Sequence, residues 1–240
     1  MTRLSVNVNK IATLRNARGG DEPNVVEAAV RIQSFGADGI TVHPRPDARH
    51  ITYEDVRALK SVVKTEFNIE GYPSKDFVAL VCEVKPAQVT LVPDPPDVLT
   101  SNAGWDVVQH RHMLTDVLHE FRGHGIRTSL FIETEQAQIE AAAAVGCDRI
   151  ELYTEAFAVR HKEIGRTAAE PYALAASWAH EAGLGVNAGH DLTLQNLRDF
   201  ADAVPHLDEV SIGHALISDA LYLGMSNAVA QYRACLNSVA

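Results

Sequence analysis

The feature of this sequence that most restricts its fold is a repeated alternation of short strand-like segments with longer helical patterns. The strand-like segments are short and apolar, and several contain β-branched residues that favour the extended conformation. Strands that alternate with helices of this length need helical crossovers, which indicates parallel pairing. The predicted strands are Leu4–Val8, Gly39–Val42, Asn68–Gly71, Gln88–Val92, Arg127–Ile132, Asp148–Leu152, Gly185–Ala188 and Glu209–Ile212.

The segments between these strands carry apolar residues at helical spacing. Val25, Ala29 and Ile32 lie at positions i, i+4 and i+7 of one such segment. Residues 52–55 resemble a capping box at the start of another. The predicted helices cover residues 25–32, 56–63, 77–84, 107–121, 136–145, 171–182, 192–204 and 220–236.

Eight strand–helix units in 240 residues predict an α/β protein, a (β/α)8 TIM barrel built as a single domain over residues 1–240. An open doubly wound sheet is the alternative, but it predicts a Gly-x-Gly-x-x-Gly turn after the first strand, which this sequence lacks. Residues 154–166 form a long polar connection for this fold. We interpret that connection as an insertion over the barrel mouth or as an oligomer contact.

Charge and cysteine content restrict the partners and the compartment. The formal net charge of −10 disfavours nucleic acid and anionic membranes, because both prefer extended basic surface. The N-terminus lacks the apolar run of a signal peptide, and no segment reaches ~18 uninterrupted apolar residues. Cys82, Cys147 and Cys235 are far apart and have apolar neighbours, so we expect reduced core thiols in a cytoplasmic protein.

Polar and ionisable residues recur where the predicted strands end. In a (β/α)8 barrel the active site lies at the carboxyl ends of the strands, so these residues are treated together. Two prolines stiffen the loop after the second strand, and its cations are therefore suited to hold an anionic substrate. The strand-end residues are Asn7, Asn9, Lys10, His43, Arg45, His50, Glu70, Thr100, Glu151, His190 and His214.

Two glutamates, Glu70 and Glu151, lie within apolar strands. A buried carboxyl must be paired, protonated or functional. Pairing with an arginine remains the alternative for Glu70, and orientation of a neighbour remains the alternative for Glu151. A lone His43 could be a buried histidine bonded to a backbone carbonyl, but equivalent positions for Glu70 and His190 on other strands favour catalysis.

The last two strands are followed by the dipeptides Gly189-His190 and Gly213-His214. This fold commonly forms a phosphate site there from loop amides and a helix N-terminus. Glycine lets the backbone N–H groups approach a phosphate closely. Together with Arg18, Arg45 and His50, these dipeptides predict a small phosphorylated substrate.

Six motifs closely resemble the pyridoxine 5′-phosphate synthase family, and they occur in consistent order from residue 4 to about residue 230. The resemblance implies a (β/α)8 transferase of vitamin B6 biosynthesis that condenses 1-deoxy-D-xylulose 5-phosphate with 3-amino-2-oxopropyl phosphate. Pyridoxine 5′-phosphate, phosphate and water are the implied products. It also implies a homo-octamer that needs no cofactor, and we expect no metal. The motifs are Val6–Gly19, Gly36–His43, Arg49–Thr52, Ser129–Ile132, Val186–His190 and Ile212–Ala215.

The resemblance implies roles for individual residues as well. His43, Glu70 and His190 match the acid/base residues, and Glu151 matches a carboxylate that supports the transition state. The loop around Thr100, with prolines at its base, is a candidate lid. The residues implied to contact the aminoketone phosphate are Asn7, Arg18, Gly213 and His214, and Arg18 is implied to reach toward the site of a neighbouring subunit. The residues implied to contact the sugar phosphate are Arg45, His50 and Thr100.

The sequence departs from the family pattern at residues expected to contact substrate. Many members have Asp-His where this chain has Asn9-Lys10, and lysine cannot exchange a proton near neutral pH as an imidazole does. Many members have glycine where this chain has Asp191. A carboxylate beside a phosphate would repel it, so we expect Asp191 to turn away and cap a helix that begins at Leu192.

Other functions remain open from the residues alone. A metal-dependent barrel hydrolase would use His43, His50, Glu70 and His190, although the first strand lacks a His-x-His pair. A Schiff-base aldolase would use Lys10 as its nucleophile. A phosphate-binding protein without enzymatic activity would have no reason to bury Glu70.

Overall fold

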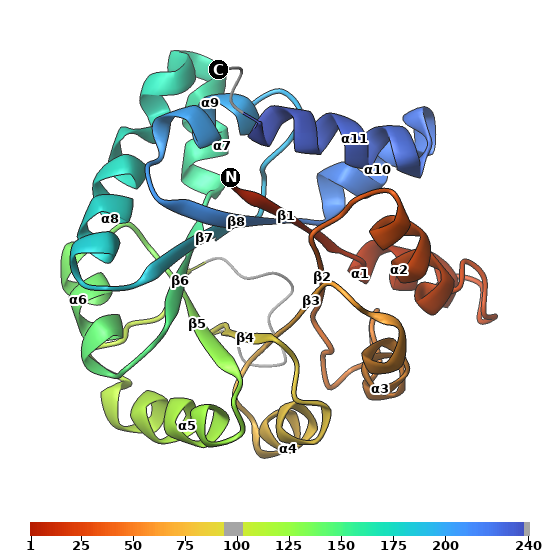
Figure 1. Ribbon diagram of the computed structural model, residues 1–240, viewed down its shortest axis with the longest axis horizontal. Coiled ribbons are helices and arrows are strands. Elements are labelled where there is room, and N and C mark those ends of the chain that lie inside the picture. The colour runs from red at the N-terminus through yellow and green to blue at the C-terminus, as the bar shows by residue number, and fades with distance from the viewer. Residues whose placement is uncertain (94–102, 238–240) are drawn as a thin grey trace.

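The computed structural model describes residues 1–93 and 103–237, and its centre is a closed barrel of eight parallel strands surrounded by helices (Figure 1). Each strand pairs with the next one along the chain, and the last pairs with the first. The predicted (β/α)8 barrel is therefore confirmed. The strands are β1 (Arg3–Asn7), β2 (Gly39–Val42), β3 (Glu66–Gly71), β4 (Gln88–Leu91), β5 (Arg127–Ile132), β6 (Arg149–Tyr153), β7 (Gly185–Gly189) and β8 (Leu207–Ile212).

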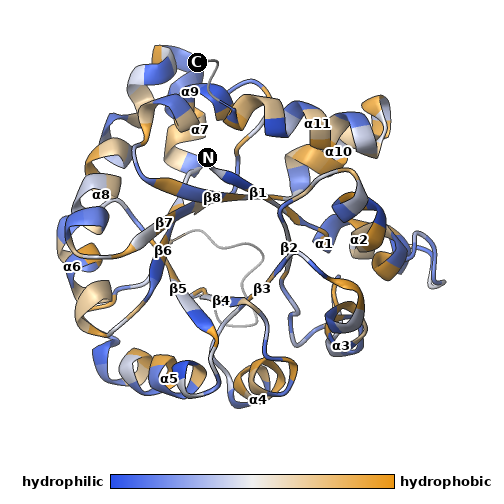
Figure 2. Cartoon of the chain, viewed as in Figure 1, coloured by the Kyte–Doolittle hydropathy of each residue, from blue (hydrophilic) through white to orange (hydrophobic). Residues whose placement is uncertain are grey.

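Residues along each strand alternate between two environments, and Figure 2 shows apolar and polar residues mixed along the ring. Val6 and Ile40 belong to the apolar core that the helices cover. Ser5 and Thr41 are buried as well, and their hydroxyl oxygens lie 2.7 Å apart. Because successive strand residues point to opposite faces, the apolar set packs under the helices and the polar set fills the barrel.

Several helices begin at capping residues that the sequence supplies. Asn24, Thr52 and Ser74 each accept a hydrogen bond from the backbone N–H three residues later, and Thr52 forms the predicted capping box with Asp55. In the described part of the chain, no helix has the length and apolar character needed to span a bilayer. The helices are α1 (Asn9–Asn16), α2 (Val25–Ser34), α3 (Tyr53–Val62), α4 (Lys75–Val84), α5 (Arg111–Gly123), α6 (Gln136–Ala144), α7 (Glu155–Ile164), the 3-10 helix η1 (Gly165–Ala169), α8 (Glu170–Glu181), α9 (Leu197–Ala203), α10 (His214–Leu223) and α11 (Met225–Leu236).

The helices differ from the prediction after β1 and near the C-terminus. The residues after β1 form α1, where the sequence predicted only a connection. The helix predicted over residues 220–236 is instead two helices, α10 and α11. Gly224 separates them with a φ of +78°, a conformation that glycine adopts without steric cost.

The long connection after β6 contains α7 and η1. The Phe157 ring of α7 packs against Phe200 of α9, with 4.9 Å between ring centroids. His161 Nε2 lies 2.8 Å from the Asp199 carboxylate. These contacts hold α7 beside α9 and outside the ring of strands (Figure 1), so the predicted position over the barrel mouth is wrong. The alternative, an oligomer contact, stays a prediction.

Candidate active site

Polar side chains from the ends of four strands meet around Glu70. Asn7 Nδ2, from the end of β1, donates a hydrogen bond to Glu70 Oε2 at 3.4 Å. The Ser211 hydroxyl, from β8, donates to Glu70 Oε1 at 3.5 Å. Nδ1 of His43, the residue after β2, lies 4.0 Å from Glu70 Oε2. The barrel thus brings together the predicted residues His43, Glu70 and Asn7.

Glu70 is a buried carboxyl that changes protonation state near neutral pH. Burial raises its pKa to about 7, although the hydrogen bond from Ser211 and the charge of Arg45 both favour the ionised form. A group with this pKa takes up and releases protons readily under physiological conditions.

Glu151, on β6, is the second carboxyl predicted for the site. It is 2% exposed, and its Oε2 has no hydrogen-bond partner within the described residues. Burial raises the pKa of Glu151 well above its usual value, and the nearby Glu70 raises it further. Gly189 on β7 makes room for this side chain, because a Cβ there would lie 2.5 Å from Glu151 Oε1. Burial and the nearby Glu70 thus both favour the protonated form of Glu151, which can donate a hydrogen bond.

His43 is held in place through its backbone. Its N–H donates to Asn9 Oδ1 at 2.9 Å, and the Asn9 N–H donates to Asn7 Oδ1 at 3.0 Å. Asn9 thus links the ends of β1 and β2 within the protein. Burial lowers the pKa of His43 well below its usual value, and the charges of Arg45, His50 and His190 lower it further. These causes all favour the neutral form of the His43 imidazole.

The cation-rich loop after β2 is fixed by α1. Arg15 donates to both carboxylate oxygens of Asp55, at 2.6 and 2.9 Å, and Asn16 Nδ2 donates to the His50 carbonyl at 2.9 Å. His50 Nδ1 accepts the N–H of the next residue at 3.0 Å, so a neutral His50 carries its proton on Nε2. Burial is the largest cause that lowers the pKa of His50, to about 4.

Arg45 lies in the middle of this group. Its side chain is buried. Its charge helps to lower the pKa values of His43 and His50, and it opposes the rise that burial causes in the pKa of Glu70. A buried guanidinium among neutral imidazoles is suited to bind a phosphate, because it offers several donors in fixed geometry.

His190 follows β7, which is four strands around the ring from β3. It therefore lies at the wall of the barrel opposite Glu70. Its ring contacts Phe131 and Tyr153, with centroids 5.2 and 5.4 Å apart. Its φ of +67° is uncommon outside glycine. The buried Thr154 hydroxyl holds this backbone, since it donates to the Gly189 and His190 carbonyls at 2.6 and 2.8 Å.

The segment after His190 corrects one prediction. Helix α9 begins at Leu197, so the helix that Asp191 was expected to cap at Leu192 does not exist. Asn196 organises the turn instead. Its Nδ2 donates to the Asp191 carbonyl at 3.0 Å, and its Oδ1 accepts the Thr193 N–H at 2.8 Å. The role of Asp191 as a substrate contact stays a prediction.

Strand β8 leads directly into α10, with Gly213 at the N-cap and His214 as the first helical residue. A Cβ at Gly213 would lie 3.1 Å from the Asn7 Cβ, so glycine permits the two strand ends to pack closely. The N-terminus of α10 therefore lies beside Asn7 and the Glu70 cluster. Free N–H groups and the helix dipole make such a terminus attractive to anions.

The remaining predicted residues lie around this cluster or outside the described chain. Lys10 is exposed in the first turn of α1, and its charge lowers the pKa of His50. This exposure disfavours the aldolase alternative, because a Schiff-base lysine is usually activated by desolvation. Arg18 is exposed in the turn after α1. Thr100, and with it the predicted lid, lies outside the described residues.

A metal-dependent hydrolase would need its histidines and Glu70 to converge on one ion. Over residues 1–93 and 103–237, no three of His43, His50, Glu70 and His190 place ligand atoms within 4.8 Å of one another. The group that does so lies elsewhere, on α4 and at the end of α5.

The sequence analysis missed four residues that shape the site: Arg15, Asn16, Thr154 and Ser211. Strand alternation could have identified Ser211, because it lies two residues after Glu209 on the inner face of β8. The helix α1 was itself missed, so Arg15 and Asn16 had no assigned position. The Thr154 hydroxyl donates to backbone carbonyls at the end of the adjacent strand β7, about 35 residues later in the chain, and the sequence gives no signal for such a contact.

Solved structures with a similar fold share little sequence with this chain. An aminoacrylate-bound tryptophan synthase from M. tuberculosis has a TM-score of 0.65 at 12% identity, covering 98% of this chain and 94% of that chain. Thiamine phosphate pyrophosphorylase from Pyrococcus furiosus has a TM-score of 0.63 at 13% identity, and the match covers 98% of this chain and 95% of that chain. Likeness at this level of identity concerns the barrel alone.

Sequence relatives are far closer. A relative from Christiangramia forsetii named pyridoxine 5′-phosphate synthase is 63% identical over 97% of this chain and 98% of its own length. A relative of the same name from Porphyromonas gingivalis is 59% identical over 97% of this chain and 98% of its own length. Another from Bacteroides fragilis is 58% identical over 98% of this chain and 100% of its own length. The family described as "Pyridoxal phosphate biosynthesis protein PdxJ" matches residues 4–238. The chain belongs to this family, whose named relatives are pyridoxine 5′-phosphate synthases.

Proposed function

We propose that this chain is a pyridoxine 5′-phosphate synthase, the activity for which its relatives are named. It condenses 1-deoxy-D-xylulose 5-phosphate with 3-amino-2-oxopropyl phosphate, closes the pyridine ring and releases phosphate and water. The observation that supports this most directly is the position of Glu70. This buried carboxyl, with a pKa of about 7, lies 4.0 Å from the neutral imidazole of His43 at the barrel mouth.

The reaction consists of steps that each move a proton: imine formation, loss of phosphate and water, attack of a carbon nucleophile on a carbonyl, and aromatisation. Glu70 takes up and returns protons because its pKa lies near the working pH. His43 accepts protons as a neutral imidazole. His190 acts as an acid from the opposite wall of the barrel.

Glu151 supports the transition state as a neutral acid. Its raised pKa keeps the carboxyl protonated, and its unpartnered Oε2 is available for a hydrogen bond to substrate oxygen. A donor that is already buried and oriented stabilises developing negative charge without solvent reorganisation.

The two phosphates bind on different sides of the cluster. Arg45 and His50, with Lys10 nearby and Thr100 on the following loop, hold the sugar phosphate. The N-terminus of α10 holds the aminoketone phosphate. The residues that contact this second phosphate are Asn7, Gly213, His214 and Arg18 of a neighbouring subunit, whereas the carboxylate of Asp191 contacts substrate away from the phosphate. Asn9 acts through the backbone of His43, to which it is bonded.

The chain forms one domain over residues 1–240 and assembles as a cytoplasmic homo-octamer. Leu14 on α1, and Leu221 and Tyr222 on α10, are large apolar side chains with exposed fractions of 55%, 72% and 90%. Exposed apolar side chains of this size fit a contact between subunits. All three cysteines are free thiols, as expected in a reducing compartment.

The test is formation of pyridoxine 5′-phosphate by the purified protein from the two substrates, followed by absorbance and identified by mass. We expect turnover by the unmodified chain, with an inflection in the pH profile near 7 that reports Glu70. Glu70→Gln keeps the size of the side chain but cannot exchange a proton. We therefore expect kcat to fall by roughly 100-fold or more and the inflection to disappear.

Asp76→Asn, which alters an exposed carboxyl in the first turn of α4, is the matched control and should retain the rate and the pH profile. A Glu70→Gln variant with unchanged turnover would refute the catalytic assignment. Phosphate-ester binding without any product would support the binding-protein alternative instead.

A further inference from the structure

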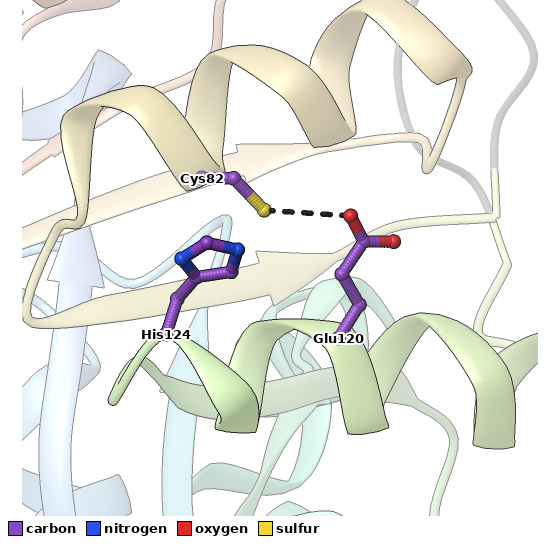
Figure 3. Close-up of side chains that lie close together, drawn as sticks. All are labelled: Cys82, Glu120 and His124. Atoms are coloured by element: carbon purple, nitrogen blue, oxygen red, sulfur yellow. Dashed lines mark hydrogen bonds between the residues drawn. The ribbon is translucent and has the colours of Figure 1, made fainter.

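A second group of chemically reactive side chains lies on the outside of the barrel. Cys82 projects from α4, whereas Glu120 and His124 project from α5 and the residue that ends it (Figure 3). Their ligand atoms all lie within 4.8 Å of one another. We propose that Cys82, Glu120 and His124 bind a zinc ion between α4 and α5.

The fold itself brings these residues together. Helices α4 and α5 are neighbours in the outer ring (Figure 1). Glu120 and His124 are four residues apart, which places both on the same face of a helix. Leu118 and Phe121, by contrast, are fully buried against the sheet. The face that carries Glu120 and His124 is thus directed toward Cys82 on α4, as Figure 3 shows.

The spacing suits tetrahedral coordination. Zn–S and Zn–O bonds of ~2.3 and ~2.1 Å at a tetrahedral angle place sulfur and oxygen about 3.6 Å apart. Cys82 Sγ and Glu120 Oε1 are 3.8 Å apart. Glu120 and His124 are exposed, so small side-chain rotations bring all three ligand atoms to bonding distance.

The donor set selects the metal. Thiolate, imidazole and carboxylate are the three protein ligands of zinc, whereas Ca²⁺ and Mg²⁺ prefer oxygen ligands alone. Three protein ligands leave the fourth position for water. Cys82 had been predicted as a core thiol, but it is only half-buried, which gives an ion access to its sulfur.

The position of the site indicates a structural role. Cys82 and His124 lie near the C-terminal ends of their helices, which lead back to the amino ends of β4 and β5. In a (β/α)8 barrel this end contributes stability, and catalysis takes place at the other. A zinc ion here would cross-link two helices in the folded chain and so favour folding.

Binding must displace a proton. Burial raises the pKa of the Cys82 thiol, and the neighbouring Glu120 carboxylate raises it further. The thiol is therefore protonated at neutral pH, and zinc has to compete with that proton. Affinity should accordingly increase with pH, and binding should release protons to the buffer.

Cobalt titration of the reduced full-length protein gives a direct test, because a Co²⁺–thiolate bond produces a charge-transfer absorption band. We expect this band in the unmodified protein, and we expect Zn²⁺ to displace it. Cys82→Ser should abolish the band. Glu120→Gln and His124→Asn should each weaken Zn²⁺ binding by at least roughly ten-fold. Both change exposed side chains, so the fold should persist.

Two matched controls separate this site from others. His119→Asn changes an exposed histidine next to Glu120, about 100° away around the helix, and Cys235→Ser removes a half-buried thiol elsewhere. Both should keep the band and the rise in Tm that Zn²⁺ causes. The proposal is overturned if the protein shows no band, if the band survives Cys82→Ser, or if Zn²⁺ stabilises the Cys82→Ser variant equally. The last outcome would mean that the stabilising ion binds away from Cys82.

Discussion

The carboxyl groups of Glu70, Glu151 and Glu209 are buried inside the barrel. Burial is the largest cause of a raised pKa in each: to about 7 for Glu70, well above the usual value for Glu151, and to about 8 for Glu209. Each therefore reduces stability when it ionises. Glu70 and Glu151 belong to the proposed catalytic group, whereas Glu209 lies 3.8 Å from Arg3 near the other end of the barrel.

Glu209 gives a stability prediction with a definite sign. In the unfolded chain its carboxyl ionises from about pH 4.5, but in the folded protein it keeps its proton until about pH 8. The free energy of unfolding should thus fall as pH rises through this interval and stay constant above it. Glu209→Gln removes this loss, so the free energy of unfolding of the variant should exceed that of the unmodified protein by up to about 5 kcal/mol at pH 9.

Urea unfolding at pH 5 and pH 9 measures this difference. The Glu209 charge also raises the pKa of Glu70, so its removal favours ionisation of Glu70 and adds to the difference in the same direction. A gap that does not widen with pH would mean that Arg3 and Arg149 already stabilise the Glu209 carboxylate in the fold.

At the level of elements, the sequence predicted the strands well, because each is a compact apolar segment next to a helix end. It failed where the helical pattern is irregular. The buried face of α1 includes Arg15, which is paired with Asp55, so its apolar periodicity is broken. In α7 the fully buried residue is Phe157, and the rest of the helix is polar or partly exposed.

The candidate site was predictable only in part. His43 and Glu70 were identified because the barrel topology brings the strand ends together, independently of the conformations of the loops. The local prediction at Asp191 was wrong, because Asn196 organises that turn through two hydrogen bonds from five residues away. Asn9 was expected to contact substrate, but it is bonded to the His43 backbone, a contact that depends on the detailed path of two loops.

The turn after β7 depends on one hydroxyl, which gives a prediction about His190. Thr154→Val keeps the shape of the side chain but removes the hydrogen bonds to the Gly189 and His190 carbonyls. We expect stability to fall by about 1 kcal/mol. We also expect kcat to fall roughly ten-fold, with KM nearly unchanged, because an acid is misplaced while the phosphate contacts remain.

Thr154→Ser restores a hydroxyl at the same place and should recover most of the lost kcat. Steady-state kinetics of both variants decide the matter. An equal loss in Thr154→Ser would show that packing of the methyl group, rather than the hydrogen bonds, positions this turn.

For the whole molecule, the proposed assembly makes each site depend on two chains. Arg18 is exposed in the turn after α1, four residues after the exposed Leu14. A cation that is solvated in one subunit gains a function if it completes the phosphate site of a neighbour. Loss of Arg18 and loss of His43 would then inactivate different halves of a shared site.

Mixed assemblies of Arg18→Ala and His43→Ala chains test this dependence. Each variant alone should be nearly inactive. In a mixed pair, one site combines His43 of one chain with Arg18 of the other, while the second site lacks both. Random pairing within a two-fold interface should therefore restore about one quarter of the unmodified activity. Co-expression with two affinity tags, followed by assay of the doubly purified assemblies, measures the recovery. If the mixed assemblies stay inactive, Arg18 serves the site of its own subunit, and no neighbour is needed to complete it.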